Sequence, residues 1–124
     1  MAKKILIVEN EESIRILIST ILGNLDDYRI TCARDGEEGM RVAREGNPDI
    51  ILLDNRLPGI SGLEVCGLMK LDPAMSGTKI LILSCQGQNF DWQQAQKMGA
   101  DGYLTKPFST TVLLEKVAEL TRNN

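Results

Sequence analysis

The stretch DIILLD, at residues 49–54, decides the fold that this sequence predicts. Four consecutive branched apolar residues lie between two aspartates, which is typical of a strand buried on both faces of a parallel sheet. Residues 4–8 (KILIV) and 80–84 (ILILS) have the same character. Residues 28–33 form a less apolar strand and residues 101–105 a fifth one. We therefore expect five strands, with the three most apolar at the centre of the sheet.

Segments with helical periodicity separate these strands. The first ends at Gly23-Asn24 and has its apolar residues at helical spacing: Ile14, Leu17, Ile18, Ile21, Leu22 and Leu25. Further helices are expected over 36–45, around 63–69 and over 89–98, and a last one has the apolar stripe Val112, Leu113, Val117 and Leu120. Strands that alternate with helices predict parallel strands joined by right-handed crossovers. The expected fold is a flavodoxin-like, doubly wound α/β sheet in the order 2-1-3-4-5, with the weaker strand 28–33 at an edge.

Length and composition are those of one globular domain, which we place at residues 1–124. The chain is 43% hydrophobic and 25% charged, with a net charge of −3, so it has no cationic field that would attract nucleic acid. No apolar run approaches the ~20 residues of a membrane span. Three cysteines favour a reduced, cytoplasmic setting. The absence of histidine excludes Ser-His and Cys-His catalysis and a phosphohistidine carried by this chain.

Polar side chains stand where four of the predicted strands end. Glu9 and Asn10 follow the first strand, Asp54 ends the third, Ser84 ends the fourth, and Lys106 follows the fifth. In a doubly wound sheet, ligands bind beyond the carboxyl ends of the strands, where the strand order reverses. We therefore expect two carboxylates, an amide, a hydroxyl and an ammonium group on one rim of the sheet.

Four segments at these strand ends resemble the receiver (response regulator) domain of two-component signalling. They are KILIVENEESIR (4–15), PDIILLDNRLPGISGLEV (48–65), KILILSCQG (79–87) and GADGYLTKPF (99–108). The resemblance extends from Lys4 to about Leu120. It implies that Asp54 accepts a phosphoryl group from a kinase phosphohistidine with Mg²⁺ as cofactor, and that the chain is a signalling module rather than an enzyme. A metal is needed because an anionic carboxylate must approach an anionic phosphoryl group.

The resemblance also implies roles for the residues around Asp54. Ser84 and Lys106 would each bond an oxygen of the bound phosphoryl group, and Tyr103 would turn inward on activation. A cis peptide bond would precede Pro107, and Cys85 would be the small side chain beside the site. Taken alone, Asp54 could start a turn, Lys106 could be a solvated charge, Ser84 could bond the local backbone, and Tyr103 could be a static aromatic.

The pair Glu9-Asn10 departs from the two acids that receiver domains usually have after the first strand. The implied metal ligands are Glu9, Asn10, Asp54 and the backbone carbonyl of Arg56. An Asn oxygen ligates a hard cation only as a dipole, so losing one carboxylate would weaken Mg²⁺ binding by roughly 1–4 kcal/mol. The longer side chain of Glu9 could compensate. Asn10 also has a structural interpretation as the N-cap of the first helix, with Glu11 in its positive first turn.

Two other functions compete with a working phosphoacceptor. The loss of charge at Asn10 favours a phosphorylation-independent interaction module, a pseudo-receiver that keeps the fold without the chemistry. A flavin carrier is disfavoured because residues 9–12 (ENEE) would repel its phosphate. The side chain of Arg56 would contact the phosphoryl group or extend into solvent, and Gln86 occupies a second position expected to influence dephosphorylation.

The resemblance implies partners, although the sequence does not identify them. The phosphodonor would be a sensor histidine kinase or a phosphotransfer protein. The phosphorylated domain would act on a downstream protein or an output domain. A phosphorylation-dependent dimer is compatible with the same resemblance. The output surface would lie within residues 86–121, where Trp92 is either an exposed interface anchor or a half-buried packing residue.

Overall fold

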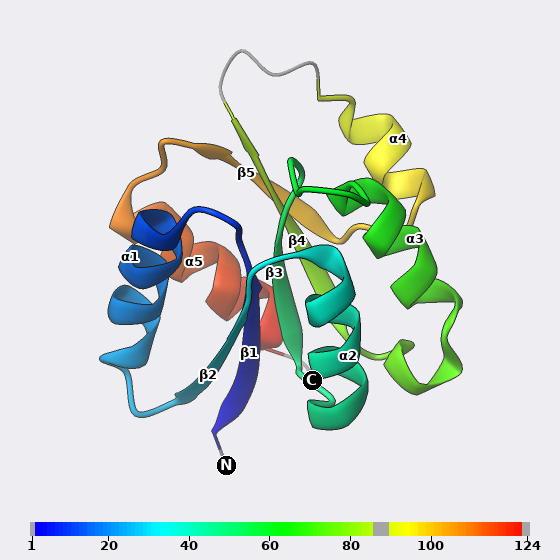
Figure 1. The fold of residues 1–124 in the computed structure, drawn as a ribbon. Helices are drawn as coiled ribbons and strands as arrows, with labels where there is room; N and C mark the ends of the chain where they lie inside the picture. Colours follow the sequence, from blue (N-terminus) through cyan, green and yellow to red (C-terminus); the bar gives the residue numbers. More distant parts are fainter. Residues whose placement is uncertain (1, 86–89, 123–124) are drawn as a thin grey trace.

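The computed structural model describes residues 2–85 and 90–122, which form one five-stranded parallel sheet flanked by helices (Figure 1). The strands are β1 (Lys3–Val8), β2 (Tyr28–Ala33), β3 (Ile50–Asp54), β4 (Lys79–Cys85) and β5 (Gly102–Lys106). Their order is β2-β1-β3-β4-β5, and every neighbouring pair is parallel. The predicted fold class and strand order are confirmed.

Helices cover both faces of the sheet. Their bounds are α1 (Glu12–Gly23), α2 (Gly36–Gly46), α3 (Gly62–Leu71), α4 (Trp92–Lys97) and α5 (Thr110–Thr121), with a short 3₁₀ helix at Pro73–Met75. α1 and α5 lie on one face, and α2, α3 and α4 lie on the other (Figure 1). Successive residues of β3 therefore contribute to two separate cores, Ile50 and Leu52 to one and Ile51 and Leu53 to the other.

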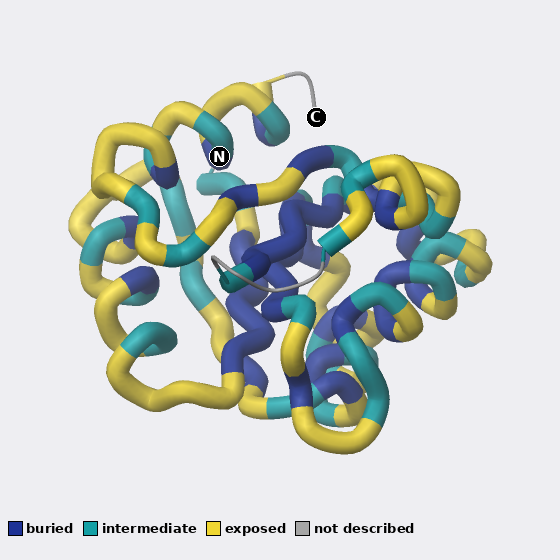
Figure 2. The backbone as a smooth tube through the Cα atoms, turned by 90° about the horizontal axis from the view of Figure 1, so that it is seen from above, coloured by how far each residue is buried: buried dark blue, intermediate teal, exposed yellow. Residues whose placement is uncertain are grey.

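Burial explains which strands are central. All five residues of β3 are buried, whereas β2 has exposed or partly buried residues at every position before its last residue, Ala33. Figure 2 shows the buried segments gathered at the centre of the chain, with exposed segments around them. A strand packed by helices on both faces gains from apolar side chains at every position, and an edge strand does not. The continuous apolar runs therefore indicated the central strands correctly.

Some predicted elements shift where a side chain intervenes at their ends. The helix expected over 89–98 begins at Trp92, because the carboxylate of Asp91 accepts hydrogen bonds from the backbone N–H groups of Gln93 and Gln94. Residues 86–89, which include Gln86, lie outside the described part of the chain. β5 starts at Gly102 rather than Asp101, whose carboxylate accepts from Lys70 Nζ and from the backbone N–H of Ile80.

The apolar stripes predicted for the first and last helices are too wide. Leu17 is 51% exposed and Val112 is 42% exposed, and Leu25 lies outside α1. Successive residues of an α-helix are rotated by about 100° around its axis. Two residues adjacent in the sequence therefore cannot both lie at the centre of the face that packs against the core. Ile18 and Leu113 occupy that stripe and are buried, while their neighbours Leu17 and Val112 lie on its flank. Within the described residues, no helix is long and apolar enough to cross a membrane.

Candidate functional site

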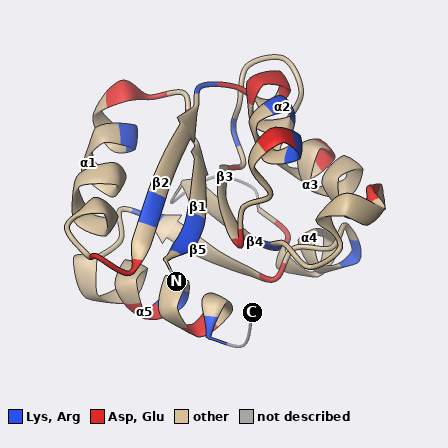
Figure 3. Cartoon of the chain, turned by 90° about the horizontal axis from the view of Figure 1, so that it is seen from below, with Lys and Arg blue, Asp and Glu red and all other residues tan. Residues whose placement is uncertain are grey.

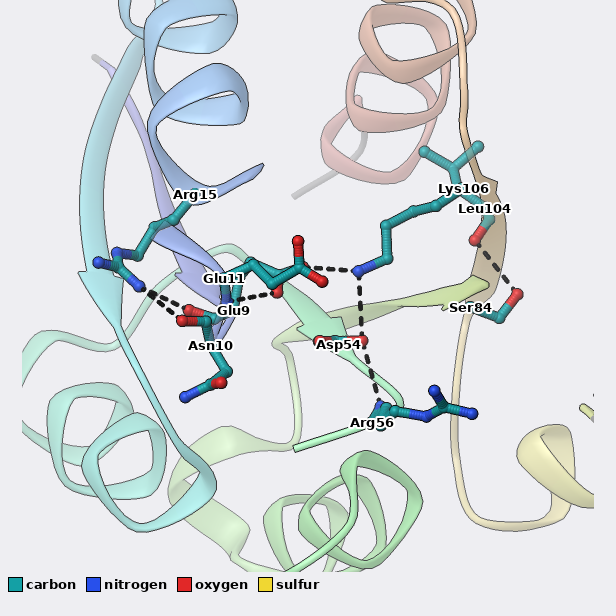
Figure 4. A network of polar contacts seen from close by, with 9 residues as sticks. All are labelled: Glu9, Asn10, Glu11, Arg15, Asp54, Arg56, Ser84, Leu104 and Lys106. Atoms are coloured by element: carbon teal, nitrogen blue, oxygen red, sulfur yellow. Dashed lines mark hydrogen bonds and ion pairs between the residues drawn. The ribbon is translucent and has the colours of Figure 1, made fainter. Parts of the chain in front are cut away.

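The ends of β1, β3 and β5 bring Glu9, Asp54 and Lys106 together (Figure 4). Lys106 Nζ lies 2.8 Å from Glu9 Oε1 and 3.5 Å from Asp54 Oδ1. The side chain of Glu9 is fully buried, and those of Asp54 and Lys106 are only 6% and 10% exposed. Three charged groups therefore share a nearly dry site, where their interactions are stronger than they would be in water.

The strand register explains why the side chains of Glu9, Asp54 and Lys106 lie close together. Val8 pairs with Leu53, so the residues that follow them, Glu9 and Asp54, come side by side at the carboxyl edge of the sheet. Lys106 comes from β5, one strand further away, and pairs with Cys85 of the intervening β4. Its four-carbon side chain reaches across β4 to the two carboxylates. The Lys106–Pro107 peptide bond is cis, as expected.

The same surroundings change how Asp54 and Lys106 titrate. Burial and then the nearby Glu9 carboxylate raise the pKa of Asp54 from 3.8 to about 6, against the opposing effects of the Arg56 N–H and of Lys106. Burial alone would lower the pKa of Lys106, but its contacts with Glu9 and Asp54 outweigh burial and raise that pKa. At neutral pH the site therefore holds an ammonium group and an ionised Asp54.

The loop after β3 is folded tightly against Asp54. Arg56 N donates to Asp54 Oδ1 at 3.1 Å, and Gly62 N donates to the carbonyl of Asn55 at 3.1 Å. A Cβ atom on Gly62 would overlap the carbonyl oxygen of Asp54, so α3 can begin this close only at a glycine. The loop 55–61 is thereby held beside the carboxylate.

A cleft of about 290 Å³ opens above Asp54. Its lining residues come from the strand ends and from the loops that follow them: Asn10, Glu11, Asp54, Arg56, Leu57, Pro58, Cys85 and Lys106. Figure 3 views the molecule from the opposite, amino end of the sheet, where basic and acidic residues are interspersed along the chain. The cleft gives a small anionic group a path to the Asp54 carboxylate, with Lys106 on its wall.

Asn10 lines the cleft but does not have the capping role considered for it. Its Nδ2 donates to the carbonyl of Arg34 at 3.4 Å, and the N-cap of α1 is Glu11, whose side chain makes no capping hydrogen bond. Instead, Glu9 Oε2 accepts from Glu11 N at 3.0 Å. Arg15 Nη1 donates to the carbonyls of Glu9 and Asn10 at 2.9 Å and 3.4 Å (Figure 4). The N-cap interpretation of Asn10 is therefore wrong, because α1 begins at Glu12 and the residue that precedes it is Glu11.

Ser84 lies near the other site residues and bonds elsewhere. Its hydroxyl donates to the carbonyl of Leu104 at 3.4 Å, and the residue is 2% exposed. The sequence left open a bond to the local backbone, but this acceptor lies on the neighbouring strand β5, 20 residues further along the chain. Ser84 is not among the residues that line the cleft, so its hydroxyl would have to rotate before it could contact a group bound at Asp54.

Tyr103 faces away from the cleft, in an aromatic cluster with Phe90 and Trp92. The ring centroids of Tyr103 lie 5.4 Å from Phe90 and 5.0 Å from Trp92. Tyr103 is 40% exposed, and Trp92 packs partly buried against the core beneath α3 and α4. Trp92 is thus a half-buried packing residue, which was the second of its two interpretations.

The donor atoms at the cleft suit a hard cation. Carboxylate and amide oxygens of Asp54, Glu11 and Asn10 are available to it, and Mg²⁺ typically uses one or two carboxylates while keeping several waters. In the part of the chain that the structure describes, no three Asp, Glu, Cys or His side chains are grouped as a complete metal cage. This donor set fits Mg²⁺ and does not suit a metal that requires several protein ligands.

Sequence reasoning missed two residues of this site. Glu11 was assigned only to the helix dipole, and Arg15 was given no role, although both shape the loop after β1. Glu11 directly follows the Glu9-Asn10 pair, which was the one available signal. The contact of Arg15 with two backbone carbonyls has no sequence signature.

Comparison with known proteins identifies the family. The model of the family described as "Response regulator receiver domain" matches residues 5–118 of this chain. The chain is 38% identical over 124 residues to the alkaline phosphatase synthesis transcriptional regulatory protein PhoP of Bacillus subtilis (strain 168), covering 100% of this chain and 50% of that protein. It therefore spans about half the length of this relative. The chain belongs to the response regulator receiver domain family, whose members are signalling modules of two-component systems.

Solved structures agree with this assignment. The chemotaxis response regulator CheY4 of Vibrio cholerae is 28% identical, with a TM-score of 0.89 over 97% of this chain and 99% of that one. The receiver domain of the sensor histidine kinase PA1611 from Pseudomonas aeruginosa PAO1 is 26% identical, with a TM-score of 0.88 over 99% of this chain and 100% of that one. The PA1611 structure has a magnesium ion coordinated in its active site cleft.

Proposed function

We propose that this chain takes a phosphoryl group from a histidine kinase or a phosphotransfer protein onto Asp54 in a Mg²⁺-dependent reaction. One observation carries the proposal: a nearly buried carboxylate stands at the base of a cleft, with the ammonium group of Lys106 at 3.5 Å. The chain acts as a signalling switch and not as an enzyme with its own substrate turnover. Its net charge of −3 gives no support for direct binding to nucleic acid.

In the proposed transfer, an Asp54 carboxylate oxygen attacks phosphorus. The new O–P bond forms as the P–N bond of the donor phosphohistidine breaks, and the electron pair of that bond leaves with the donor nitrogen. Bound Mg²⁺ supplies positive charge that reduces the repulsion between the two anions. Asp54, Asn10, Glu9 and the backbone carbonyl of Arg56 are the ligands that the family resemblance implies. Lys106 pairs with a phosphoryl oxygen, and the Ser84 hydroxyl rotates from the Leu104 carbonyl to another.

The proposed output surface comprises α4, β5 and α5, which adjoin the site through Lys106 and Ser84. Tyr103 is the residue placed to transmit a change, because it belongs to the strand that ends in Lys106 and its ring contacts Trp92. Movement of the Ser84 hydroxyl would free the Leu104 carbonyl beside Tyr103. A downstream protein, an output domain or a second phosphorylated copy would bind this surface, in a reduced cytoplasmic setting.

The test is incubation of the protein with a small acyl phosphate and saturating MgCl₂, followed by intact-mass spectrometry. We expect a mass gain of one phosphoryl group that is labile to hydroxylamine, as an acyl phosphate should be. Asp54→Asn should show no gain, and Asp49→Asn, at the residue that directly precedes the same strand, should be labelled like the wild type. A wild-type protein that gains no mass would contradict the proposal.

A phosphorylation-independent interaction module is the second candidate. It is favoured by the side chain of Asn10, which donates to the Arg34 carbonyl, and by the 2.8 Å pair that already engages Lys106 with Glu9. The mass experiment separates the two candidates. An unlabelled wild-type protein that still binds a partner from its own pathway would establish the second.

Arg56→Ala is expected to shorten the half-life of the acyl phosphate by about threefold to tenfold, or ~0.7–1.4 kcal/mol in activation free energy. The Arg56 side chain is exposed and lines the cleft, where it would restrict the approach of water to the phosphorus. The decay of the label after removal of phosphodonor measures this half-life. Arg56→Met separates bulk from charge, and an unchanged half-life in Arg56→Ala would assign the side chain to solvent.

A further inference from the structure

The cleft lacks one of the negative charges that its proposed cation would use. The residue after Glu9 is Asn10, whose amide nitrogen donates to the Arg34 carbonyl. Both carboxylate oxygens of Glu9 are engaged, Oε1 with Lys106 at 2.8 Å and Oε2 with the backbone N–H of Glu11 at 3.0 Å. Asp54 is thus the one acid of the expected set that remains open to the cleft.

Glu11 is a further acid on the wall of this cleft, and no ligand role has been assigned to it. Its backbone N–H is held by Glu9 Oε2, which fixes the residue at the edge of the site. It is the N-cap of α1, yet its side chain makes no capping hydrogen bond. Across residues 2–85 and 90–122, its carboxylate has no ion pair or hydrogen-bond partner, so α1 does not require that group.

We propose that Glu11 supplies the second carboxylate of the magnesium site, in place of the acid that is missing at position 10. This inference rests on the proposed function and adds one ligand to it. Because Mg²⁺ retains several waters, the Glu11 carboxylate acts either directly or through one bound water. A negative charge roughly 6 Å from a divalent cation strengthens its binding by about tenfold in a water-like dielectric, and salt reduces the effect.

The decisive measurement is Mg²⁺ binding to the intact protein by isothermal titration calorimetry, without phosphodonor. Glu11→Gln should raise the Kd for Mg²⁺ by about threefold to tenfold. Glu12→Gln is the matched control, since Glu12 is the neighbouring acid in the first turn of α1 and is not part of the cleft lining. The Kd of Glu12→Gln for Mg²⁺ should differ from that of the wild type by less than about twofold, because the charge removed at Glu12 is distant from the cation and screened by salt.

Asn10→Asp tests the same inference in the opposite direction. A carboxylate at position 10 should lower the Kd for Mg²⁺. In that background Glu11→Gln should raise the Kd less than it does in the wild type, because Glu11 is then not the only carboxylate that supplements Asp54. Equal effects of Glu11→Gln and Glu12→Gln would overturn the inference, and so would a wild type that binds no Mg²⁺. Failure of the proposed function is recognised separately, by wild-type protein that is not labelled at saturating MgCl₂.

Discussion

Replacing Lys106 with methionine is expected to lower the free energy of unfolding by about 3 kcal/mol at pH 7, because two buried carboxylates lose their shared counter-ion. The Lys106 side chain is 10% exposed, and it contacts the fully buried Glu9 and the 6% exposed Asp54. Methionine keeps an unbranched side chain that lacks only the terminal ammonium position, so the loss measures charge more than packing. Since the pKa of Lys106 is raised above its ordinary 10.5, its contribution is present throughout the range below pH 10.5.

Urea denaturation followed by circular dichroism measures this effect. Lys97→Met is the matched control, because Lys97 is an exposed lysine on α4, and its replacement should change stability by no more than about 0.5 kcal/mol. The double variant Lys106→Met/Glu9→Gln should recover a large part of the loss, since it removes one of the two unpaired carboxylates. Equal stability of Lys106→Met and wild type would mean that the ion pairs contribute nothing.

The architecture of the sheet could be predicted because its signal is local and strong. Each of the three central strands contains an uninterrupted run of four apolar residues, and this pattern identifies a strand covered on both sides by helices. The position of Asp54 followed from the same reasoning, since the last residue of a central parallel strand lies at the edge where ligands bind. The placement of Lys106 within reach of it followed from the strand order.

The side-chain arrangement within the site could not be predicted in the same way. A cap of α1 was one interpretation of Asn10 beside metal binding, but its amide donates to Arg34, 24 residues further along the chain. Glu9 was treated as a metal ligand, yet it makes the shortest contact with Lys106 in the site. These choices depend on partners that the fold brings together and on the extra methylene group of Glu9. Local propensity contains no information about either.

The orientation of Tyr103 illustrates a signal that was available and not used. β5 alternates between buried and exposed residues at positions 102–105, so Tyr103 and Leu104 must face opposite sides of the sheet. Leu104 is buried on the face that α1 and α5 cover. Tyr103 therefore lies on the opposite face, where Phe90 and Trp92 contact it. An inward position for Tyr103, as the resemblance implies for the activated state, would require a change of side-chain rotamer and displacement of this aromatic cluster.

Replacing Asp54 with asparagine is expected to stabilise the metal-free protein by about 1–3 kcal/mol at pH 7–8. The Asp54 side chain is buried, and burial and then the Glu9 carboxylate raise its pKa from 3.8 to about 6. A carboxyl group with a raised pKa is bound more tightly to its proton in the folded state. Its ionisation therefore destabilises the fold as pH rises from about 4 to 6, and the full penalty persists at higher pH.

The pH dependence distinguishes this electrostatic explanation from a packing effect. In EDTA, the difference in unfolding free energy between Asp54→Asn and wild type should be largest above pH 6 and should shrink on acidification toward pH 4, where Asp54 is protonated in both states. Asp26→Asn, which replaces an exposed aspartate beyond α1, is the matched control and should change the unfolding free energy at pH 7 by no more than about 0.5 kcal/mol. A constant difference across this range would mean that asparagine merely packs better. If Asp54→Asn were instead less stable than wild type above pH 6, the sign of the effect would be reversed: Lys106 would stabilise Asp54 as the anion, and there would be no electrostatic cost for a bound cation or phosphoryl group to relieve.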